Sequence, residues 1–273
     1  MRRAAHQLLD APLIHEDPIA LAILDPAQAA AIRADPRQFD EGPVSSSLRA
    51  FLAVRSRVAE DTLAEVVARG VRQYVVLGAG LDTFAYRNPH AGVRVFEVDR
   101  HETQAWKRER LAAGGIDVPD TVTFAAIDFS VESVPAVLQR AGLLADEPTF
   151  FSWLGVTPYL ESATVLATLA ALAPLAARGG GIVFDYSIPP SSMEARQRAL
   201  FEQMAARVAR AGEPFKGFFT AEALTTVLTM MGFSEIRDTG ARELNARYFA
   251  GRDDGLRVGG AGRILTALST TLT

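Results

Sequence analysis

Short apolar segments alternate with amphipathic segments from about residue 72 onward, and this alternation constrains the fold more than any other feature of the chain. Each apolar run is short, continuous and bounded by turn residues, which favours a buried strand over a half-exposed one. The predicted strands cover residues 72–80, 93–99, 121–129, 149–155, 181–187, 233–239 and 262–269. The predicted helices between them cover residues 101–115, 131–142, 161–181, 191–212 and 220–232.

This order predicts an α/β fold in which one open, mostly parallel, seven-stranded sheet carries helices on both faces. No long helical pattern separates the last two strands, so we expect them to form an antiparallel hairpin at one edge. A long helix is predicted from Ser45, where serines can cap it, to a stop at Gly70. Residues 1–45, which contain five spaced prolines, predict a helical N-terminal arm or lid. Residues 46–273 then form a single domain.

Composition narrows the classes of function. The 273-residue chain has a formal net charge of -4, with 28 basic and 32 acidic residues interspersed, which argues against a nucleic-acid partner. It has no cysteine, so disulfides, thiolate nucleophiles and zinc–thiolate sites are excluded, and no metal site is predicted. No apolar run approaches the roughly 20 residues that span a bilayer. We expect a soluble cytoplasmic protein that does not bind membranes and acts on a small molecule.

The first predicted strand ends in Gly78-Ala79-Gly80, where the backbone can turn sharply and approach a ligand closely. In an open α/β sheet, ligands bind beyond the carboxyl ends of the strands. The second strand ends in "FEVD", which places Glu97 and Asp99 about 20 residues further on. A carboxylate there can accept hydrogen bonds from both ribose hydroxyls. These features predict a nucleoside pocket at this edge of the sheet.

Two further positions indicate which nucleoside is bound. Asp128 and Phe129 end the third strand, where they can take an adenine amino group and cover the ring. A dinucleotide fingerprint needs a third glycine, but Thr83 stands there. Asp82 would repel a pyrophosphate and suits a cationic ligand such as a sulfonium. Adenosine with a cationic amino-acid tail describes S-adenosylmethionine.

Three segments, "RQYVVLGAGLDTFAYR", "FEVDRHETQAWKRERL" and "SWLGVTPYLE", resemble the leucine carboxyl methyltransferase family of class I S-adenosylmethionine-dependent O-methyltransferases with a Rossmann-like fold. The likeness extends from about Asp10 to the closing "ALS", and its most specific part is residues 55–110. It implies that Arg57, with Arg55 as second choice, pairs with the carboxylate of the cofactor. It also implies that the two glycines face the methionine part, that Asp99 holds the ribose, and that Asp128 and Phe129 hold the adenine.

One departure concerns the acceptor. Many members of the family carry Glu-Gly after the fourth strand, where this chain has Leu154-Gly155; Tyr159 of the matching "YLE" is retained. A carboxylate acceptor is ionised at neutral pH and needs no general base, whereas a hydroxyl needs one. His15 is the best of four histidines for that task, provided that the arm folds over the pocket. The remaining candidates for the acceptor pocket are Trp153, Tyr186, Arg247 and Tyr248.

Methyl transfer to a carboxylate is therefore the simpler interpretation, with a hydroxyl acceptor as its variant. Two interpretations from other classes stay open at this point. A methyltransferase-fold protein that binds the cofactor without catalysis is compatible with Leu154. A nicotinamide-dependent oxidoreductase is disfavoured by Asp82 and Thr83.

Overall fold

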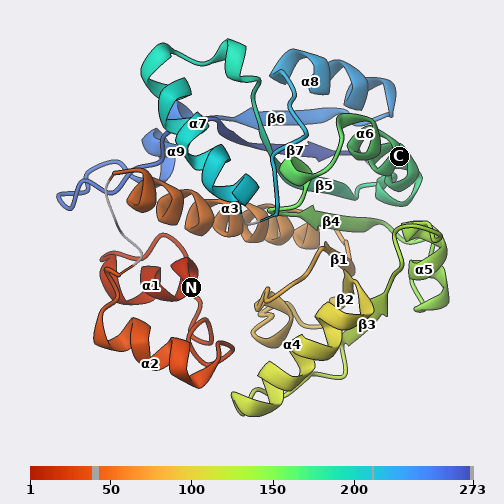
Figure 1. Ribbon diagram of the computed structural model, residues 1–273. Helices are drawn as coiled ribbons and strands as arrows, with labels where there is room; N and C mark the ends of the chain where they lie inside the picture. The colour runs from red at the N-terminus through yellow and green to blue at the C-terminus, as the bar shows by residue number, and fades with distance from the viewer. Residues whose placement is uncertain (39–42, 211, 271–273) are drawn as a thin grey trace.

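A seven-stranded sheet forms the centre of the computed structural model, which describes residues 1–38, 43–210 and 212–270 (Figure 1). The strand order is β3-β2-β1-β4-β5-β7-β6. Strands β1 to β5 are parallel, and β7 runs antiparallel to both of its neighbours, β5 and β6. The strands are β1 (Gln73–Leu77), β2 (Arg94–Asp99), β3 (Val122–Ala126), β4 (Thr149–Trp153), β5 (Gly181–Ser187), β6 (Glu235–Thr239) and β7 (Gly262–Leu268).

The helices begin and end close to the predicted positions, and several carry side-chain caps. The predicted serine cap of the long helix is wrong, because this helix begins at Pro43 and Ser45 lies inside it. Ser133 caps α5 and Thr220 caps α8, each through a side-chain oxygen that accepts a backbone N–H. The α-helices are α1 (Arg2–Leu9), α2 (Pro26–Ala34), α3 (Pro43–Ala68), α4 (His101–Ala113), α5 (Val134–Arg140), α6 (Ser162–Ala176), α7 (Ala195–Arg210), α8 (Ala221–Met230) and α9 (Ala241–Tyr248). Single 3-10 turns are η1 (Phe84–Tyr86), η2 (Thr157–Tyr159) and η3 (Pro190–Ser192).

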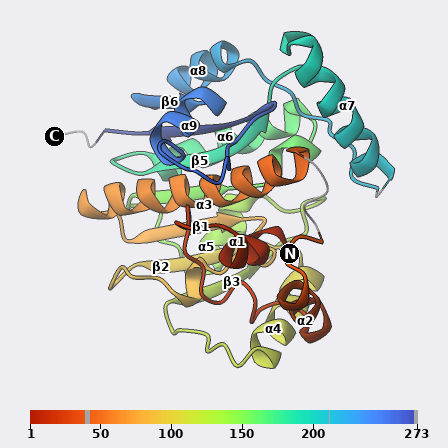
Figure 2. The same ribbon diagram turned by 90° about the vertical axis from the view of Figure 1, so that its left-hand side faces the viewer.

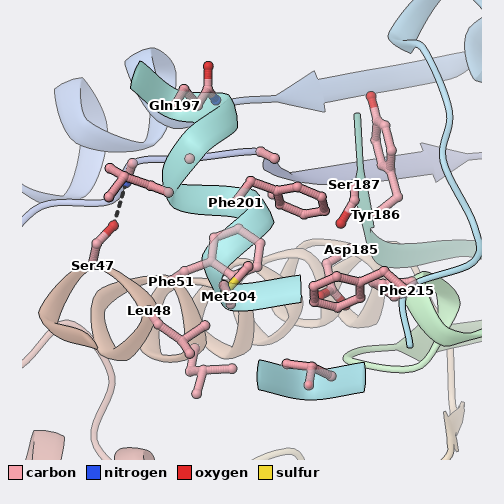
Figure 3. Close-up of a pocket in the computed structure, with 18 of the residues that line it drawn as sticks. Ser47, Leu48, Phe51, Asp185, Tyr186, Ser187, Gln197, Phe201, Met204 and Phe215 are labelled. Carbon is pink, nitrogen blue, oxygen red and sulfur yellow. Dashed lines mark hydrogen bonds between the residues drawn. The ribbon is translucent and has the colours of Figure 1, made fainter. Parts of the chain in front are cut away.

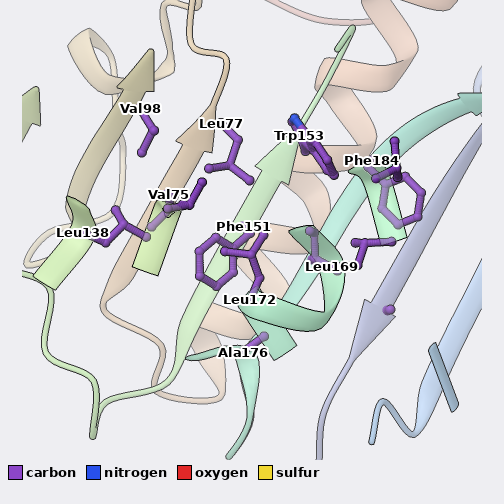
Figure 4. Close-up of a cluster of buried hydrophobic side chains, with 14 of the residues drawn as sticks. Val75, Leu77, Val98, Leu138, Phe151, Trp153, Leu169, Leu172, Ala176 and Phe184 are labelled. Atoms are coloured by element: carbon purple, nitrogen blue, oxygen red, sulfur yellow. The ribbon is translucent and has the colours of Figure 1, made fainter. Parts of the chain in front are cut away.

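Both faces of the sheet are covered, because side chains alternate between the faces along each strand. Val75 and Leu77 of β1 belong to the core under α5, α6 and α8, which Figure 4 shows. Tyr74 and Val76 belong to the opposite core, under α3 and α9. The fully buried runs of β1, β4 and β5 match the prediction of a two-sided parallel sheet.

The C-terminal strands pair as predicted but are connected differently. Strands β6 and β7 are antiparallel neighbours, yet the short helix α9 lies between them in the chain. Strand β7 is inserted between β5 and β6, which leaves β6 at the edge. The polar sequence of α9, "ARELNARY", buries only Leu244 and so carries a weak helical pattern.

The N-terminal segment folds into α1 and α2, beside the half of the sheet that holds β1 to β3 (Figure 2). Helix α1 packs on α3, and the Arg110 side chain of α4 pairs with Asp25 just before α2 at 3.2 Å. The helical arm is thus confirmed; its separation from the domain at residue 45 stays a prediction. Within the described ranges, no helix combines the length and apolar character that crossing a membrane requires.

Candidate functional site

Two adjoining cavities open beyond the carboxyl ends of the central strands. The smaller cavity, of about 290 Å³, lies at the turn after β1, and the larger cavity, of about 460 Å³, lies between α3, α7 and the end of β5. Leu52 and Arg55 of α3 line both. A molecule in one cavity is therefore separated from a molecule in the other by little more than these two side chains.

The glycine turn shapes the floor of the smaller cavity. Gly78 and Gly80 adopt left-handed backbone angles, with φ of +63° and +44°. A Cβ on Gly78 would come within 2.5 Å of the Val156 side chain, while the space around Gly80 is open. Asp99 at the end of β2 fixes this turn, because its Oδ2 accepts the backbone N–H of Gly80 at 2.7 Å. The predicted grouping of the glycine turn and Asp99 is thus present.

The N-terminal arm closes one side of the smaller cavity. Met1, Arg2, Arg3 and Ala4 line it together with the turn from Gly78 to Asp82. The guanidinium of Arg3 donates to the carbonyl of Leu81 and lies 3.7 Å from the carboxylate of Asp82. Asp82 therefore faces a cation that the protein itself supplies. Ala79 and Leu154, which were predicted to belong to the site, also line this cavity.

A buried acid orients the arginine that both cavities share. The Oδ2 atom of Asp185, on β5, accepts a hydrogen bond from Nη1 of Arg55 at 3.0 Å. Its Oδ1 atom accepts the N–H of Gly155 at 2.5 Å. Gly155 has a φ of +73°, and a Cβ there would lie 2.7 Å from the Arg55 guanidinium. Only glycine leaves room for the guanidinium at this position.

The larger cavity is mainly apolar, and its charged side chains lie in two groups. Tyr159 and Tyr186 are among the residues that line it, as predicted for both. Burial raises the pKa of Tyr159, so its hydroxyl stays protonated at neutral pH and can donate a hydrogen bond. The Tyr186 hydroxyl instead donates to Asp238 at 2.5 Å and points away from the labelled cavity side chains (Figure 3).

Glu97 lies away from both cavities. It is fully buried on β2, where it accepts hydrogen bonds from Nζ of Lys107 at 2.7 Å and from the Tyr86 hydroxyl at 2.9 Å. Although Lys107 lies on the charged helix α4, its side chain is only 1% exposed. This buried ion pair fastens α4 to the sheet, so Glu97 is not positioned as a ribose ligand.

Three further candidates are not brought into either cavity. Asp128 is exposed and accepts hydrogen bonds from the backbone and hydroxyl of Ser130. Phe129 is 56% exposed. Trp153 is buried in the core under α5 and α6, because it lies one residue from Leu154 and so points to the opposite face of the sheet.

The polar candidates on the outside of α3 meet at Asp61. The carboxylate of Asp61 accepts hydrogen bonds from Arg57 at 2.7 Å and from the Tyr248 hydroxyl at 2.9 Å, and lies 3.7 Å from Arg247. None of these three candidates lines a cavity. The order of preference between the two arginines is therefore reversed: Arg55 faces the site, and Arg57 faces outward because it is two residues away on a helix.

His15 is also engaged elsewhere. It is buried, its Nε2 lies 2.8 Å from Glu60, and it does not line either cavity. Arg87 and Asp17 belong to the same polar cluster between the arm and α3. Although the arm does fold over the smaller cavity, His15 is not placed to act as a general base there.

Sequence reasoning missed Asp185 and most of the larger cavity. Asp185 had a detectable signal, since it is an acid near the carboxyl end of an otherwise apolar strand, like Asp99. Side chains on α7 and on the segment after it had no such signal, because their helical spacing is equally typical of simple core packing.

Comparisons with known proteins bear on the family and the fold of the chain. The family model of leucine carboxyl methyltransferases matches residues 1–173. A Bacillus subtilis protein named "Putative S-adenosyl-L-methionine-dependent methyltransferase YktD" is 29% identical over 93% of this chain and 90% of its own length. A Mycobacteroides abscessus protein named "Putative S-adenosyl-L-methionine-dependent methyltransferase" is 32% identical over 70% of this chain and 63% of its own length. A solved structure from Thermobifida fusca, described as a "putative methyltransferase", has a TM-score of 0.59 at 18% identity and covers 95% of this chain and 97% of that one, which shows a shared fold.

Proposed function

Because the chain belongs to the leucine carboxyl methyltransferase family, we propose that it transfers the methyl group of S-adenosylmethionine to the carboxylate of a small molecule. Family membership and the relatives make it an S-adenosylmethionine-dependent methyltransferase. The carboxylate target and the small-molecule acceptor are the parts we propose. The contact between the two cavities at Arg55 carries the proposal, since it brings a donor site and an acceptor site together.

The smaller cavity fits the polar end of the cofactor. The left-handed turn at Gly78 and Gly80 lines this cavity, and the space beside Gly80 is open. Asp99, whose carboxylate accepts the N–H of Gly80, would hold the ribose. Arg55 would hold the cofactor's carboxylate, because only its Nη1 atom has a hydrogen-bond partner within the described ranges. Asp82 would face the cationic part, in competition with Arg3. When bound, S-adenosylmethionine supplies an activated methyl group on a sulfonium.

The larger cavity supports a carboxylate acceptor rather than a hydroxyl. Among its described lining residues there is no histidine or lysine. Asp185 is held by Arg55 and Gly155, and the Tyr159 hydroxyl keeps its proton at neutral pH. A hydroxyl acceptor would need a base to take its proton, whereas a carboxylate is already ionised. The residues of this chain would then orient the acceptor and exclude water.

Calorimetry tests the proposal at its first step. S-adenosylhomocysteine should bind to the wild-type protein, and NAD should not. Arg55→Ala should weaken the binding of S-adenosylhomocysteine, while Arg57→Ala, a matched change two residues away, should leave it unaltered. Tight NAD binding, or equal effects of the two arginine substitutions, would contradict the assigned site.

A further inference from the structure

Three aromatic side chains form a continuous stack along one wall of the larger cavity. The ring centroids of Tyr159 and Phe215 are 5.4 Å apart at an interplanar angle of 27°. Those of Phe215 and Phe201 are 5.4 Å apart at 20°. The three rings come from η2, from the segment after α7, and from α7 itself. Near-parallel rings at this spacing form an offset stack, and all three rings line the cavity.

The opposite wall is apolar as well. Leu48 and Phe51 of α3 face Phe201 and Met204 of α7 across the same space (Figure 3). Phe215 lies at the side of this space near Asp185. Its volume of about 460 Å³ exceeds what a single six-membered ring needs.

The charged side chains of the cavity lie in two groups. Arg55 and Asp185 stand at the end that adjoins the smaller cavity, and Glu194, Arg196 and Gln197 stand at the other end, around the start of α7. A ligand that matches this pattern has an apolar body of more than one ring and an acidic group at one end.

We infer that the acceptor is an aromatic carboxylic acid, whose planar ring system packs against the rings of Phe201 and Phe215 and whose carboxylate points to the junction at Arg55. The inference rests on the proposed function and specifies its substrate class. A saturated or aliphatic acid of equal size would fill the same apolar volume, but it would lack the stacking contribution that aligned ring faces provide. The aromatic stack therefore selects for planarity and not only for hydrophobicity.

A matched pair of probes separates these two properties. 2-Naphthoic acid and decahydronaphthalene-2-carboxylic acid share their carbon skeleton and charge, and only the first is planar and aromatic. Each is titrated by calorimetry into wild-type protein saturated with S-adenosylhomocysteine. Stacking adds a factor of about 2 to 12 in affinity for each ring face. We therefore expect 2-naphthoic acid to bind at least several-fold more tightly than its saturated analogue.

Two variants test whether the aromatic stack causes the preference for 2-naphthoic acid over its saturated analogue. Phe215→Leu keeps an apolar side chain but removes the central ring of the stack, so it should abolish most of the difference between the two probes. Trp106→Leu is the matched control, since Trp106 lies half-exposed on α4 and lines neither cavity. It should leave the preference unchanged.

Each outcome decides the inference. Equal or tighter binding of the saturated acid by wild-type protein would overturn it, and this comparison needs no variant to fold. Failure of both acids to bind a protein that still binds S-adenosylhomocysteine would overturn the aromatic assignment and leave the methyltransferase assignment untouched. Failure of S-adenosylhomocysteine itself to bind would refute the proposed function and the inference with it.

Discussion

Asp185 holds the guanidinium of Arg55 in the wall between the two cavities, with 3.0 Å between Oδ2 and Nη1. The side chain of Asp185 is 5% exposed and that of Arg55 is 19% exposed, so the pair is shielded from solvent. Gly155 completes the arrangement through its N–H and through its lack of a Cβ. An arginine fixed in this way can present its remaining N–H groups to a carboxylate without first losing side-chain freedom.

Loss of this support should weaken catalysis more than stability. Asp185→Asn removes the negative charge that holds the Arg55 guanidinium and leaves Arg55 free to move. We therefore expect kcat/KM for S-adenosylmethionine to fall about 10- to 100-fold. Asp61→Asn is the control, because Asp61 pairs with arginines on the outer side of α3. Steady-state kinetics of both variants, with thermal melts to confirm folding, measure the effect. An unaltered kcat/KM in Asp185→Asn would show that Arg55 does not depend on it.

Asp99 and Glu97 should respond differently to substitution, although both come from β2. Asp99→Ala removes the carboxylate that accepts the N–H of Gly80, a lining residue of the smaller cavity, and loss of one charged hydrogen bond to the cofactor corresponds to roughly 10- to 150-fold in affinity. Glu97→Gln should instead lower the melting temperature, because it leaves buried Lys107 without its anion. Calorimetric titration with S-adenosylhomocysteine and a thermal melt of each variant distinguish the two roles. Unchanged affinity in Asp99→Ala would remove it from the cofactor site.

The rate of methyl transfer should vary little between about pH 6 and 8, because a carboxylate acceptor is ionised throughout that range. The raised pKa of Tyr159 keeps its hydroxyl protonated there, so it adds no step to the profile. A profile of kcat/KM against pH, measured in buffers of constant ionic strength, tests this. A rate that rises with pH in the wild-type protein but not in His15→Ala would instead restore His15 as a base and point to a hydroxyl acceptor.

The polar cluster of His15, Glu60 and Arg87, which joins the N-terminal arm to α3, should make the free energy of unfolding depend on pH in the acid range. Burial acts to raise the pKa of Glu60, but hydrogen bonds with His15 and Arg87 outweigh it and lower the pKa from 4.5 to about 2. A carboxyl with a lowered folded-state pKa stabilises the fold above its unfolded pKa, and this stabilisation is lost as the pH falls from about 4.5 to 2. Urea unfolding of wild type and Glu60→Gln should therefore show a gap in stability near pH 6 that narrows with acid. A gap independent of pH would contradict the assigned ion pairs.

The sheet could be predicted from the sequence because its signals are local. Apolar runs that end in Gly78 or Asp99 mark both a strand and the edge where it ends, and parallel strands bring such ends together. The predicted position of the cofactor site follows from this rule alone. Asp185 obeys the same rule, and its signal was present in "GIVFDYS".

The walls of the larger cavity could not be predicted in the same way. Phe51, Phe201 and Phe215 come from distant segments, and only the tertiary fold brings their rings together. The direction in which a single side chain points was equally hard to predict. Arg55 and Arg57 differ by two positions on a helix, and Trp153 and Leu154 by one on a strand, so a small error in position reverses the direction of the side chain.

The nature of the acceptor atom is tested most directly by mass analysis of the product. The protein is incubated with S-adenosylmethionine carrying a deuterated methyl group and with matched carboxylic acids and phenols, 2-naphthoic acid and 2-naphthol among them. The account predicts a labelled methyl ester that mild alkali hydrolyses, formed from acids and not from phenols. A labelled methyl ether that survives alkali, formed from a phenol while the matched acid stays unmodified, would contradict it.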